Sequence, residues 1–263
     1  MSQPRLVSLR VHPIKSLEAV EVDSIAINRQ GMLEYDRSFA IFEGSGEIIK
    51  AKQNAEVHQL HAHYDIGTLT VTFRVHGQSG GASFHLEDQR GEINSWLSEY
   101  FERPVRLQRD ISAGFADDWT ATGPTLISTA TIETVASWFD DLSADEVRNR
   151  LRSNLEIDGV PAFWEDQLYG QTEDELVRFR VGEIELLGKN SCQRCPVPSR
   201  DVESGEPTPK FAKIFVNQRK ATLQPWAHPE RFDHYYRVAI NTQPGEIAEN
   251  SILTIGDEIE ILG

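Results

Sequence analysis

Two cysteines, Cys192 and Cys195, stand at C-x-x-C spacing with Arg194 between them, and they are the only cysteines in the 263-residue chain. A cysteine thiolate is both a nucleophile and a metal ligand, and a neighbouring positive charge favours its formation. The spacing is compatible with four kinds of chemistry. These are a redox pair of thioredoxin type, half of a zinc site, a structural disulfide, and a single reactive thiolate that ligates a soft transition metal.

Two features argue against the redox and disulfide interpretations, namely the prolines after the pair and the short spacing between the cysteines. Pro196 and Pro198 follow at once, and proline pushes the residue before it towards an extended conformation. We therefore expect Cys195 and Val197 to be extended, whereas a thioredoxin-type pair needs a helix at the motif and a surrounding βαβ pattern. A disulfide here would close too short a loop to constrain the unfolded chain much.

A zinc site needs two further ligands, because structural zinc is bound by four side chains. His61 and His63 are the best candidates, since alternate residues of a strand share one face. Histidines in such runs are usually solvated or bonded to the backbone. A zinc site made of His61, His63, Cys192 and Cys195 therefore stays open as an alternative.

Basic and hydroxyl residues provide candidate anion contacts elsewhere. Arg148, Arg150 and Arg152 form the sharpest positive cluster in the sequence. A charge run of this kind is most often a solvated face. Ser128 or Thr129 is placed to cap the start of a helix, and helix N-termini bind anions through their free N–H groups.

The overall charge excludes several functions. With 41 acidic and 26 basic residues, the net charge is −15, which argues against binding nucleic acid or an anionic membrane.

No apolar run is long enough to span a bilayer, and the N-terminus lacks the apolar region of a signal peptide. The low cysteine content favours a reducing compartment, so we expect a cytoplasmic protein that binds neither nucleic acid nor membrane.

Strands dominate the predicted elements. Alternating apolar residues, separated by turn signals, predict strands with one helix in the first hundred residues, which is typical of a barrel or sandwich. The helix has a buried stripe of Ile93, Trp96, Leu97, Tyr100 and Phe101. The predicted strands cover residues 5–11, 20–27, 39–42, 48–52, 57–64, 69–75 and 83–87.

The second half contains helices as well as strands. A helix is expected after residue 128, with Ser143 and Glu146 forming a capping box for a second one. Residues 181–187 form a strand that leads into the cysteine segment, and residues 210–220 fit either helix or strand. The irregular stretch 103–124 contains the expected domain boundary.

Several motifs together resemble those of one family. The segment Cys192-Gln-Arg-Cys195, followed by Asp201 and Gly205, resembles the signature of MOSC-domain proteins. That family is similar to the C-terminal domain of molybdenum cofactor sulfurases and includes the mitochondrial amidoxime reducing component. Further matching pieces are His12-Pro-Ile-Lys-Ser16, Tyr35-Asp-Arg37, Arg152-Ser-Asn154 and the last strand, residues 255–262.

The resemblance covers residues 11–262 and implies a fold. It is mainly β with a few helices, in the α+β class. An N-terminal MOSC β-barrel domain at residues 1–110 is expected before a MOSC β-barrel domain at residues 111–263.

The resemblance also implies a site for the molybdenum cofactor, Mo-molybdopterin. Cys195 is expected to ligate the metal and to be the catalytic residue, and a soft thiolate suits this metal. Lys15, Ser16 and Arg37 are expected to hold the phosphate and the pterin. The other implied cofactor contacts are Ser128, Thr129, Arg148, Arg152, Asn154, Arg194 and Asp201, although Asp201 also fits a role in fixing its loop.

Related enzymes reduce N-hydroxylated compounds, so the resemblance implies a molybdenum-dependent oxidoreductase acting on a small molecule. An iron–sulfur cluster needs four ligands and the chain has two cysteines, so electrons are expected from a separate protein. The polar, proline-containing stretch after Cys195 departs from the aliphatic-threonine stretch common in the reductases. The alternative is a carrier of sulfur, as a persulfide on Cys195, or of the cofactor, without redox turnover.

Overall fold

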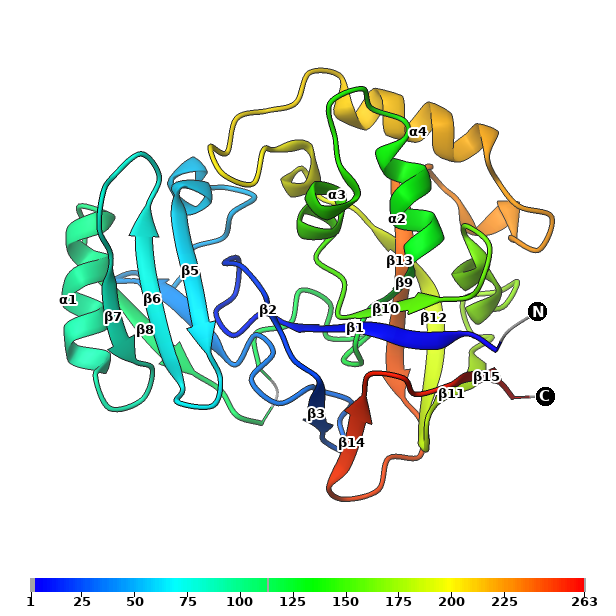
Figure 1. Ribbon diagram of the computed structural model, residues 1–263, viewed down its shortest axis with the longest axis horizontal. Helices are drawn as coiled ribbons and strands as arrows, with labels where there is room; N and C mark the ends of the chain where they lie inside the picture. Colours follow the sequence, from blue (N-terminus) through cyan, green and yellow to red (C-terminus); the bar gives the residue numbers. More distant parts are fainter. Residues whose placement is uncertain (1–2, 113, 263) are drawn as a thin grey trace.

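The computed structural model describes residues 3–112 and 114–262, and the expected fold class is confirmed: strands predominate and four α-helices accompany them. Figure 1 shows a large sheet at one end, a smaller three-stranded sheet at the other, and both chain termini beside the large sheet. None of the helices in the described ranges is long and apolar enough to cross a membrane.

The large sheet has eight strands and is mixed, because β9 and β10 run parallel while their other neighbours are antiparallel. Its inward positions are leucine, isoleucine and valine together with Phe179, and they form one continuous core with the residues packed against the sheet. In spatial order the strands are β15 (Ile259–Ile261), β11 (Val177–Val181), β12 (Ile184–Gln193), β13 (Arg237–Pro244), β9 (Leu126–Ser128), β10 (Leu155–Asp158), β1 (Arg5–Val11) and β2 (Val20–Glu21).

Three helices lie together above the large sheet (Figure 1), namely α2 (Thr129–Ala136), α3 (Ala144–Leu151) and α4 (Phe211–Ala221). The expected capping box of α3 is confirmed, since Ser143 and Glu146 each bond the other's backbone N–H. The segment that fitted helix or strand is the helix α4, which buries Phe211 and Phe215 against α2. Phe211 and Phe215 share this apolar cluster with Val238 and Ala239 of the large sheet, so tertiary packing favours the helix.

The smaller sheets build a second core around α1 (Arg90–Tyr100), which was expected from its apolar spacing. Ile93 and Leu97 are buried there, and Trp96 and Tyr100 are stacked on each other at the edge. The three-stranded sheet is β5 (Leu60–Asp65), β6 (Thr70–Val75) and β7 (Ala82–His85), and a separate pair is β4 (Phe39–Glu43) and β8 (Val105–Arg109).

Strand pairing crosses the expected boundary between residues 110 and 111. Strand β1 pairs with β10 in the large sheet, and β3 (Ser24–Ile27) pairs with β14 (Ser251–Thr254). The division into two domains stays a prediction. Within the described ranges the strands form four open sheets, without a ring of hydrogen bonds that would close a barrel.

Three local expectations were wrong. The strand expected at residues 57–64 begins at Leu60, because Ala55–Gln59 form a 3₁₀ helix. Residues 48–52 do not form a strand: Ile48 makes a single bridge to Phe42 and the chain then turns. Val197 is not extended but begins a short 3₁₀ helix, Val197–Ser199, because the fixed φ of Pro196 also suits the first turn of a helix. As expected, no α-helix begins at the cysteine motif.

Glu165 carries a carboxyl group that is buried against the large sheet. Its side chain is 1% exposed, and Oε2 accepts a hydrogen bond of 2.9 Å from the Ser128 hydroxyl. Burial, with the nearby Asp166 carboxylate, raises the pKa of Glu165 from 4.5 to about 7. The folded state therefore binds this proton more tightly than the unfolded chain does.

The raised pKa of Glu165 predicts a loss of stability on raising the pH. Between pH 4.5 and 7 the folded protein holds a proton that the unfolded chain has released, so the free energy of unfolding falls by about 3 kcal/mol across this window. Glu165→Gln, which stays neutral, should lack this fall in urea unfolding at several pH values. The exposed control Glu183→Gln should show the same fall as wild type. If the free energy of unfolding of Glu165→Gln fell with pH in the same way, the pH dependence could not be assigned to Glu165.

Candidate functional site

Strand β12 positions the two cysteines differently. Cys192 lies within the strand and is buried, and its Sγ donates a hydrogen bond of 2.7 Å to Oδ1 of Asn241 on β13. Burial raises the pKa of the Cys192 thiol to about 11, despite the opposing effect of Arg194 and Arg37. Cys195 follows the end of the strand and is exposed. Cys192 is therefore held as a thiol, whereas Cys195 is open to reaction.

A cleft of about 580 Å³ lies beside Cys195, and we call it the cysteine cleft. It is lined by the cysteine segment, the loop after β3, the turn after β4 and residues 115–118 and 121–125. Its volume is within the range of about 300–1,000 Å³ that small-molecule sites occupy. Three acidic residues line it, Asp36, Asp117 and Asp118, against six basic ones, Arg37, Lys50, Lys52, Arg150, Arg152 and Arg194.

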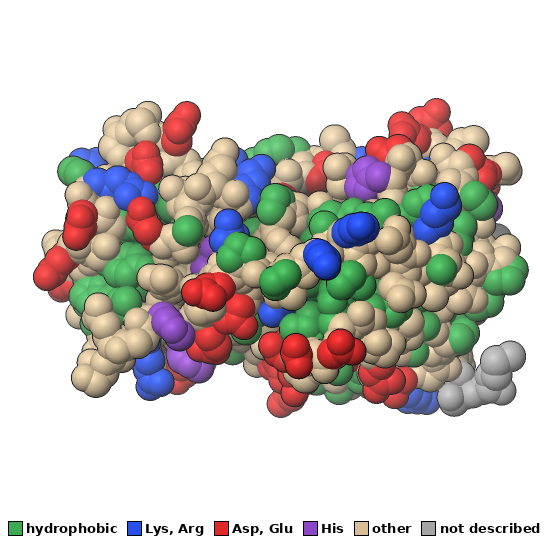
Figure 2. Space-filling view, turned by 90° about the horizontal axis from the view of Figure 1, so that it is seen from above, with side chains coloured by type: hydrophobic (Ala, Val, Ile, Leu, Met, Phe, Trp, Pro, Cys, Tyr) green, Lys and Arg blue, Asp and Glu red, His purple; other side chains and the backbone are tan. Residues whose placement is uncertain are grey.

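This excess of basic residues is local. On the face shown in Figure 2, acidic side chains gather in several groups and basic side chains stand singly or in pairs between them. The chain as a whole carries a charge of −15. A cleft with more cations than anions in such a protein favours an anionic ligand.

Asp36 joins three segments at the wall of the cleft. Its carboxylate accepts hydrogen bonds from the His12 backbone N–H at 2.8 Å, from Asn154 Nδ2 at 3.1 Å and from Arg37 Nη1 at 2.6 Å. Burial acts to raise the pKa of Asp36, but the Arg37 charge and the His12 hydrogen bonds outweigh it and hold the pKa far below its usual range. The carboxylate therefore stays ionised and fixes Arg37 at the cleft.

Arg152 lies next to Arg37, and the carboxylates of Glu18 and Asp36 act on its charge without a direct ion pair. It ends α3 in the left-handed conformation (φ 56°), which turns its side chain away from the helix, and it lines the cleft half-buried. Its guanidinium makes no hydrogen bond or ion pair with any residue in the described ranges. Burial, and then the Arg37 charge, lower the pKa of Arg152. An anion between the two guanidinium groups would relieve both effects.

Lys15 and Ser16 reach the same region from the loop after β1. The ammonium of Lys15 is buried and bonds the Phe115 carbonyl at 2.6 Å and the Asp117 carboxylate at 2.7 Å. Ser16 lines the cleft, with φ 75°, and its hydroxyl accepts the Ala51 N–H at 3.3 Å. Lys15 is therefore bonded to Asp117, which lines the cleft, whereas Lys15 itself does not line it.

Not every expected cofactor contact lies in the cysteine cleft. Cys195, Ser16, Arg37, Arg152 and Arg194 line it, and Asn154 lies buried beneath it, bonded to Asp36 and to the Arg10 carbonyl.

Four other expected contacts lie elsewhere. Ser128 is the buried cap of α2, and Thr129 donates a hydrogen bond of 2.8 Å to Glu156. Arg148 pairs with the same Glu156, and Asp201 fixes its own turn through Ser204. These contacts satisfy the four side chains internally, away from the cysteine cleft. The role of each as a cofactor contact stays a prediction.

Sequence reasoning missed three cations of the cleft. Lys50 and Lys52 were assigned to a strand, whereas the turn in which they lie brings both to the cleft. Arg150 was treated as part of a charge run, but it is 3% exposed and joins α3 to the region after the cysteine segment through Thr208 at 2.8 Å. The pattern Lys50-Ala-Lys52 is the sequence signal for the two lysines, because two cations so close together are unusual in this acidic chain.

The alternative zinc site was wrong in its composition. A second hollow of about 450 Å³, which we call the histidine groove, is lined by His58, His61, His63 and His76. Cys192 and Cys195 line the cysteine cleft instead. Among the described residues, the metal-binding side chains found close together are His61, His76 and Glu203, without a thiol.

Comparison with known families assigns both parts of the chain. Residues 3–104 match the model of the MOSC N-terminal beta barrel domain, and residues 125–260 match the model of the MOSC domain. The chain belongs to the MOSC domain family. The MOSC model covers the cysteine segment, Arg152 and Asn154, while the N-terminal model covers Lys15 and Arg37.

Curated relatives of this MOSC protein are larger. A molybdenum cofactor sulfurase of Drosophila mojavensis is 24% identical over 98% of this chain and 35% of its own length. The human molybdenum cofactor sulfurase is 22% identical over 76% of this chain and 27% of its own length. The chain thus spans about a third or less of these relatives. The YUAD protein structure from Bacillus subtilis (12% identity, TM-score 0.37, 99% and 96% of the chains) is too distant to support an argument.

The geometry of this MOSC protein suits an anionic ligand that carries a thiophilic centre. Arg37 and Arg152 are placed to bind phosphate or other oxyanions, since guanidinium groups bind them bidentately. Cys195 offers a thiol at the rim of the same cleft, which Arg194 also lines. The donor set and the volume therefore fit a molybdopterin-type cofactor, which has a phosphate and soft sulfur atoms.

The different environments of the two thiols predict selective alkylation. Native protein treated briefly with iodoacetamide at pH 8 should be labelled at Cys195 and not at Cys192, because Cys192 is buried with a pKa of about 11. Peptide mass spectrometry measures the label on each residue, and protein unfolded in urea should be labelled at both. Native labelling of Cys192 in the Cys195→Ser variant would contradict the structure.

Proposed function

We propose that this chain binds the molybdenum cofactor in the cysteine cleft, with the Cys195 thiolate as the protein ligand to the metal. The observation that carries the proposal is the convergence of an exposed thiol and an unpaired arginine, Arg152, on one cationic cleft. Membership of the MOSC family and similarity to proteins named molybdenum cofactor sulfurases support it.

The chain's own residues provide binding and orientation. Arg37, held by Asp36, and Arg152 bind the anionic part of the cofactor, while Lys50 and Lys52 add positive charge at the opening of the cleft. Arg194 is anchored by a hydrogen bond to the Leu151 carbonyl, which places its charge beside the cysteines. When bound, the cofactor supplies the oxygen-atom and electron chemistry that no side chain can perform.

The finer proposal is that the bound form reduces N-hydroxylated or other N–O compounds. Two electrons and two protons convert an N–OH group into N–H and water. The chain has two cysteines, fewer than an iron–sulfur cluster requires, so a separate electron-transfer protein supplies the electrons. The cysteine cleft is open to solvent at Cys195, so that a small molecule can reach the metal. We propose a cytoplasmic location for this reaction.

A second candidate function is that of a carrier. Cys195 is the exposed thiol of the pair, and its thiolate can take the outer sulfur of a persulfide donor, which leaves as a thiol, and pass that sulfur on in the same way. The relatives named molybdenum cofactor sulfurases favour this alternative. In this function the cofactor or its sulfur would be delivered without reduction of a substrate.

Molybdenum content tests the proposed ligand. Protein made in a host that synthesises the molybdenum cofactor should contain near-stoichiometric molybdenum by elemental mass spectrometry. Cys195→Ser should lose most of it, because a soft thiolate ligand is replaced by a hard hydroxyl. The matched Cys192→Ser variant should retain it, since Cys192 is buried against Asn241. Equal content in all three proteins would contradict ligation by Cys195.

Arg152 is predicted to bind the anionic part of the cofactor. Arg152→Gln should lower cofactor occupancy about tenfold or more, since a charge-assisted hydrogen bond contributes about 1.5–3 kcal/mol. Arg106→Gln, an exposed arginine on β8 outside the cleft, is the control. Extracted pterin measured by fluorescence gives the occupancy. The same occupancy in both variants would rule out this role for Arg152.

A reductase and a carrier differ in turnover. With a chemical electron donor and an N-hydroxylated amidine, the loaded protein should form the amidine repeatedly, and Cys195→Ser should not. A carrier would form none, and mass spectrometry would find an added sulfur atom on Cys195. That result would replace the reductase proposal with the carrier.

A further inference from the structure

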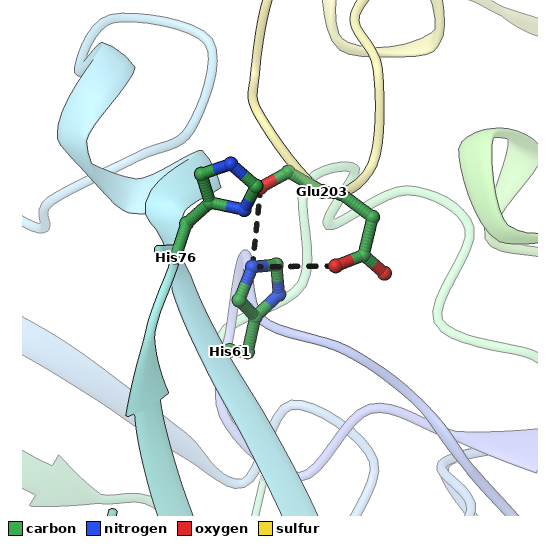
Figure 3. Close-up of side chains that lie close together, drawn as sticks. All are labelled: His61, His76 and Glu203. Carbon is green, nitrogen blue, oxygen red and sulfur yellow. Dashed lines mark hydrogen bonds and ion pairs between the residues drawn. The ribbon is translucent and has the colours of Figure 1, made fainter. Parts of the chain in front are cut away.

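Two histidines and a glutamate meet in the histidine groove, far from each other in sequence. His61 comes from β5, His76 follows the end of β6, and Glu203 belongs to the turn after the cysteine segment. Their ligating atoms all lie within 4.8 Å of one another. Figure 3 shows the imidazole of His61 below, with His76 and Glu203 turned towards it from two different parts of the chain.

Both ring nitrogens of His61 face oxygen atoms. Nδ1 lies 2.7 Å from Oε1 of Glu18, while Nε2 lies 3.1 Å from the carbonyl oxygen of Glu203 and 3.7 Å from its carboxylate. A neutral imidazole has a single N–H. When that hydrogen is on Nδ1, Nε2 presents a lone pair on the side of the Glu203 oxygens, where a metal ion can take the place of a proton.

Glu18 is placed to orient His61 as a metal ligand. Its second carboxylate oxygen accepts the Ala62 backbone N–H at 2.8 Å, so that the carboxylate is held at both oxygens. A ligating histidine in metal sites almost always donates its other ring N–H to a carboxylate or carbonyl group. Glu18 and His61 have this arrangement, with Nε2 directed at His76 and Glu203.

The turn that carries Glu203 is fixed in place. Asp201 accepts the backbone N–H groups of Glu203 and Ser204 at 3.1 and 2.8 Å. Gly205 has φ 74°, and a Cβ there would lie 2.5 Å from the Cβ of His58, so the turn packs closely on the chain before β5. Glu203 is therefore presented to the histidines by a rigid loop.

We propose that His61, His76 and Glu203 form a binding site for a divalent transition metal ion of the zinc class. Two imidazoles and a carboxylate are a zinc-type donor set, which leaves a fourth position for water or a ligand. Ligand atoms around tetrahedral zinc are about 3.4 Å apart, so the site closes slightly on binding. His76 and Glu203 are exposed and can move by this amount, and the ring nitrogens of His76 have no hydrogen-bond partner in the described ranges.

The metal would join the N-terminal three-stranded sheet to the turn that follows the cysteine segment. Arg152 and Val197 line both the histidine groove and the cysteine cleft, so the two hollows share a wall. A metal ion at this site would stabilise that wall. The site is independent of molybdenum binding, because it contains neither cysteine and uses none of the basic residues of the cleft.

Titration with Co²⁺, followed by Zn²⁺ displacement, tests the site in the full chain without molybdenum cofactor. Wild type should bind one equivalent of Co²⁺ with visible d–d bands and without a thiolate-to-cobalt charge-transfer band. His76→Ala should lose this equivalent, and Glu18→Gln should bind about 10–100-fold more weakly. His63→Ala, an exposed histidine on the same strand as His61, is the matched control and should bind as wild type does.

Thermal unfolding of the metal-free variants checks that each one is folded, and Zn²⁺ should raise the melting temperature of wild type and His63→Ala but not of His76→Ala. Equal binding by His76→Ala and His63→Ala would overturn the proposal. So would a thiolate charge-transfer band that disappears in Cys195→Ser, because the metal would then be bound by the cysteine segment instead.

Discussion

The cysteine cleft depends on the hydrogen bonds and the ion pair made by the buried carboxylate of Asp36. This carboxylate holds the loop after β1 through the His12 N–H, the Arg152–Asn154 segment through the Asn154 amide, and the adjacent Arg37 through an ion pair. Loss of one partner of a buried pair leaves an uncompensated charge and is costly. One ionised side chain thus fixes the relative positions of the N-terminal segments and the large sheet where they meet.

Charge in the cleft is balanced incompletely, since six basic residues line it against three acidic ones. Asp36 pairs with Arg37 and Asp117 with Lys15, but Arg152 makes no direct ion pair with any described residue, and Glu18 and Asp36 act on its charge only from a distance. The charge of Arg37 lowers the pKa of Arg152 after burial has done so. In a chain with a net charge of −15, this local excess of basic residues is the feature that would attract an anionic ligand.

The sequence predicted features that depend on local patterns: the capping box at Ser143, the apolar stripe of α1, and the strand that leads into the cysteine segment. It placed Arg37 and Arg152 through motifs, and the structure brings them together at one cleft. It could not predict that a turn brings Lys50 to the cleft, or that the His76 and Glu203 side chains meet. Such contacts arise from tertiary packing between segments that are distant in sequence.

We propose that the Cys195 thiolate is a ligand of a molybdenum ion whose cofactor is held in the cysteine cleft by arginine, and X-ray absorption at the molybdenum edge of the loaded protein would detect this bond. We expect a molybdenum–sulfur shell that contains one protein thiolate beyond the cofactor's sulfur atoms. Cys195→Ser protein reconstituted with excess cofactor should lose that one sulfur scatterer. An identical sulfur shell in both proteins would rule out ligation by Cys195, whatever the amount of cofactor bound.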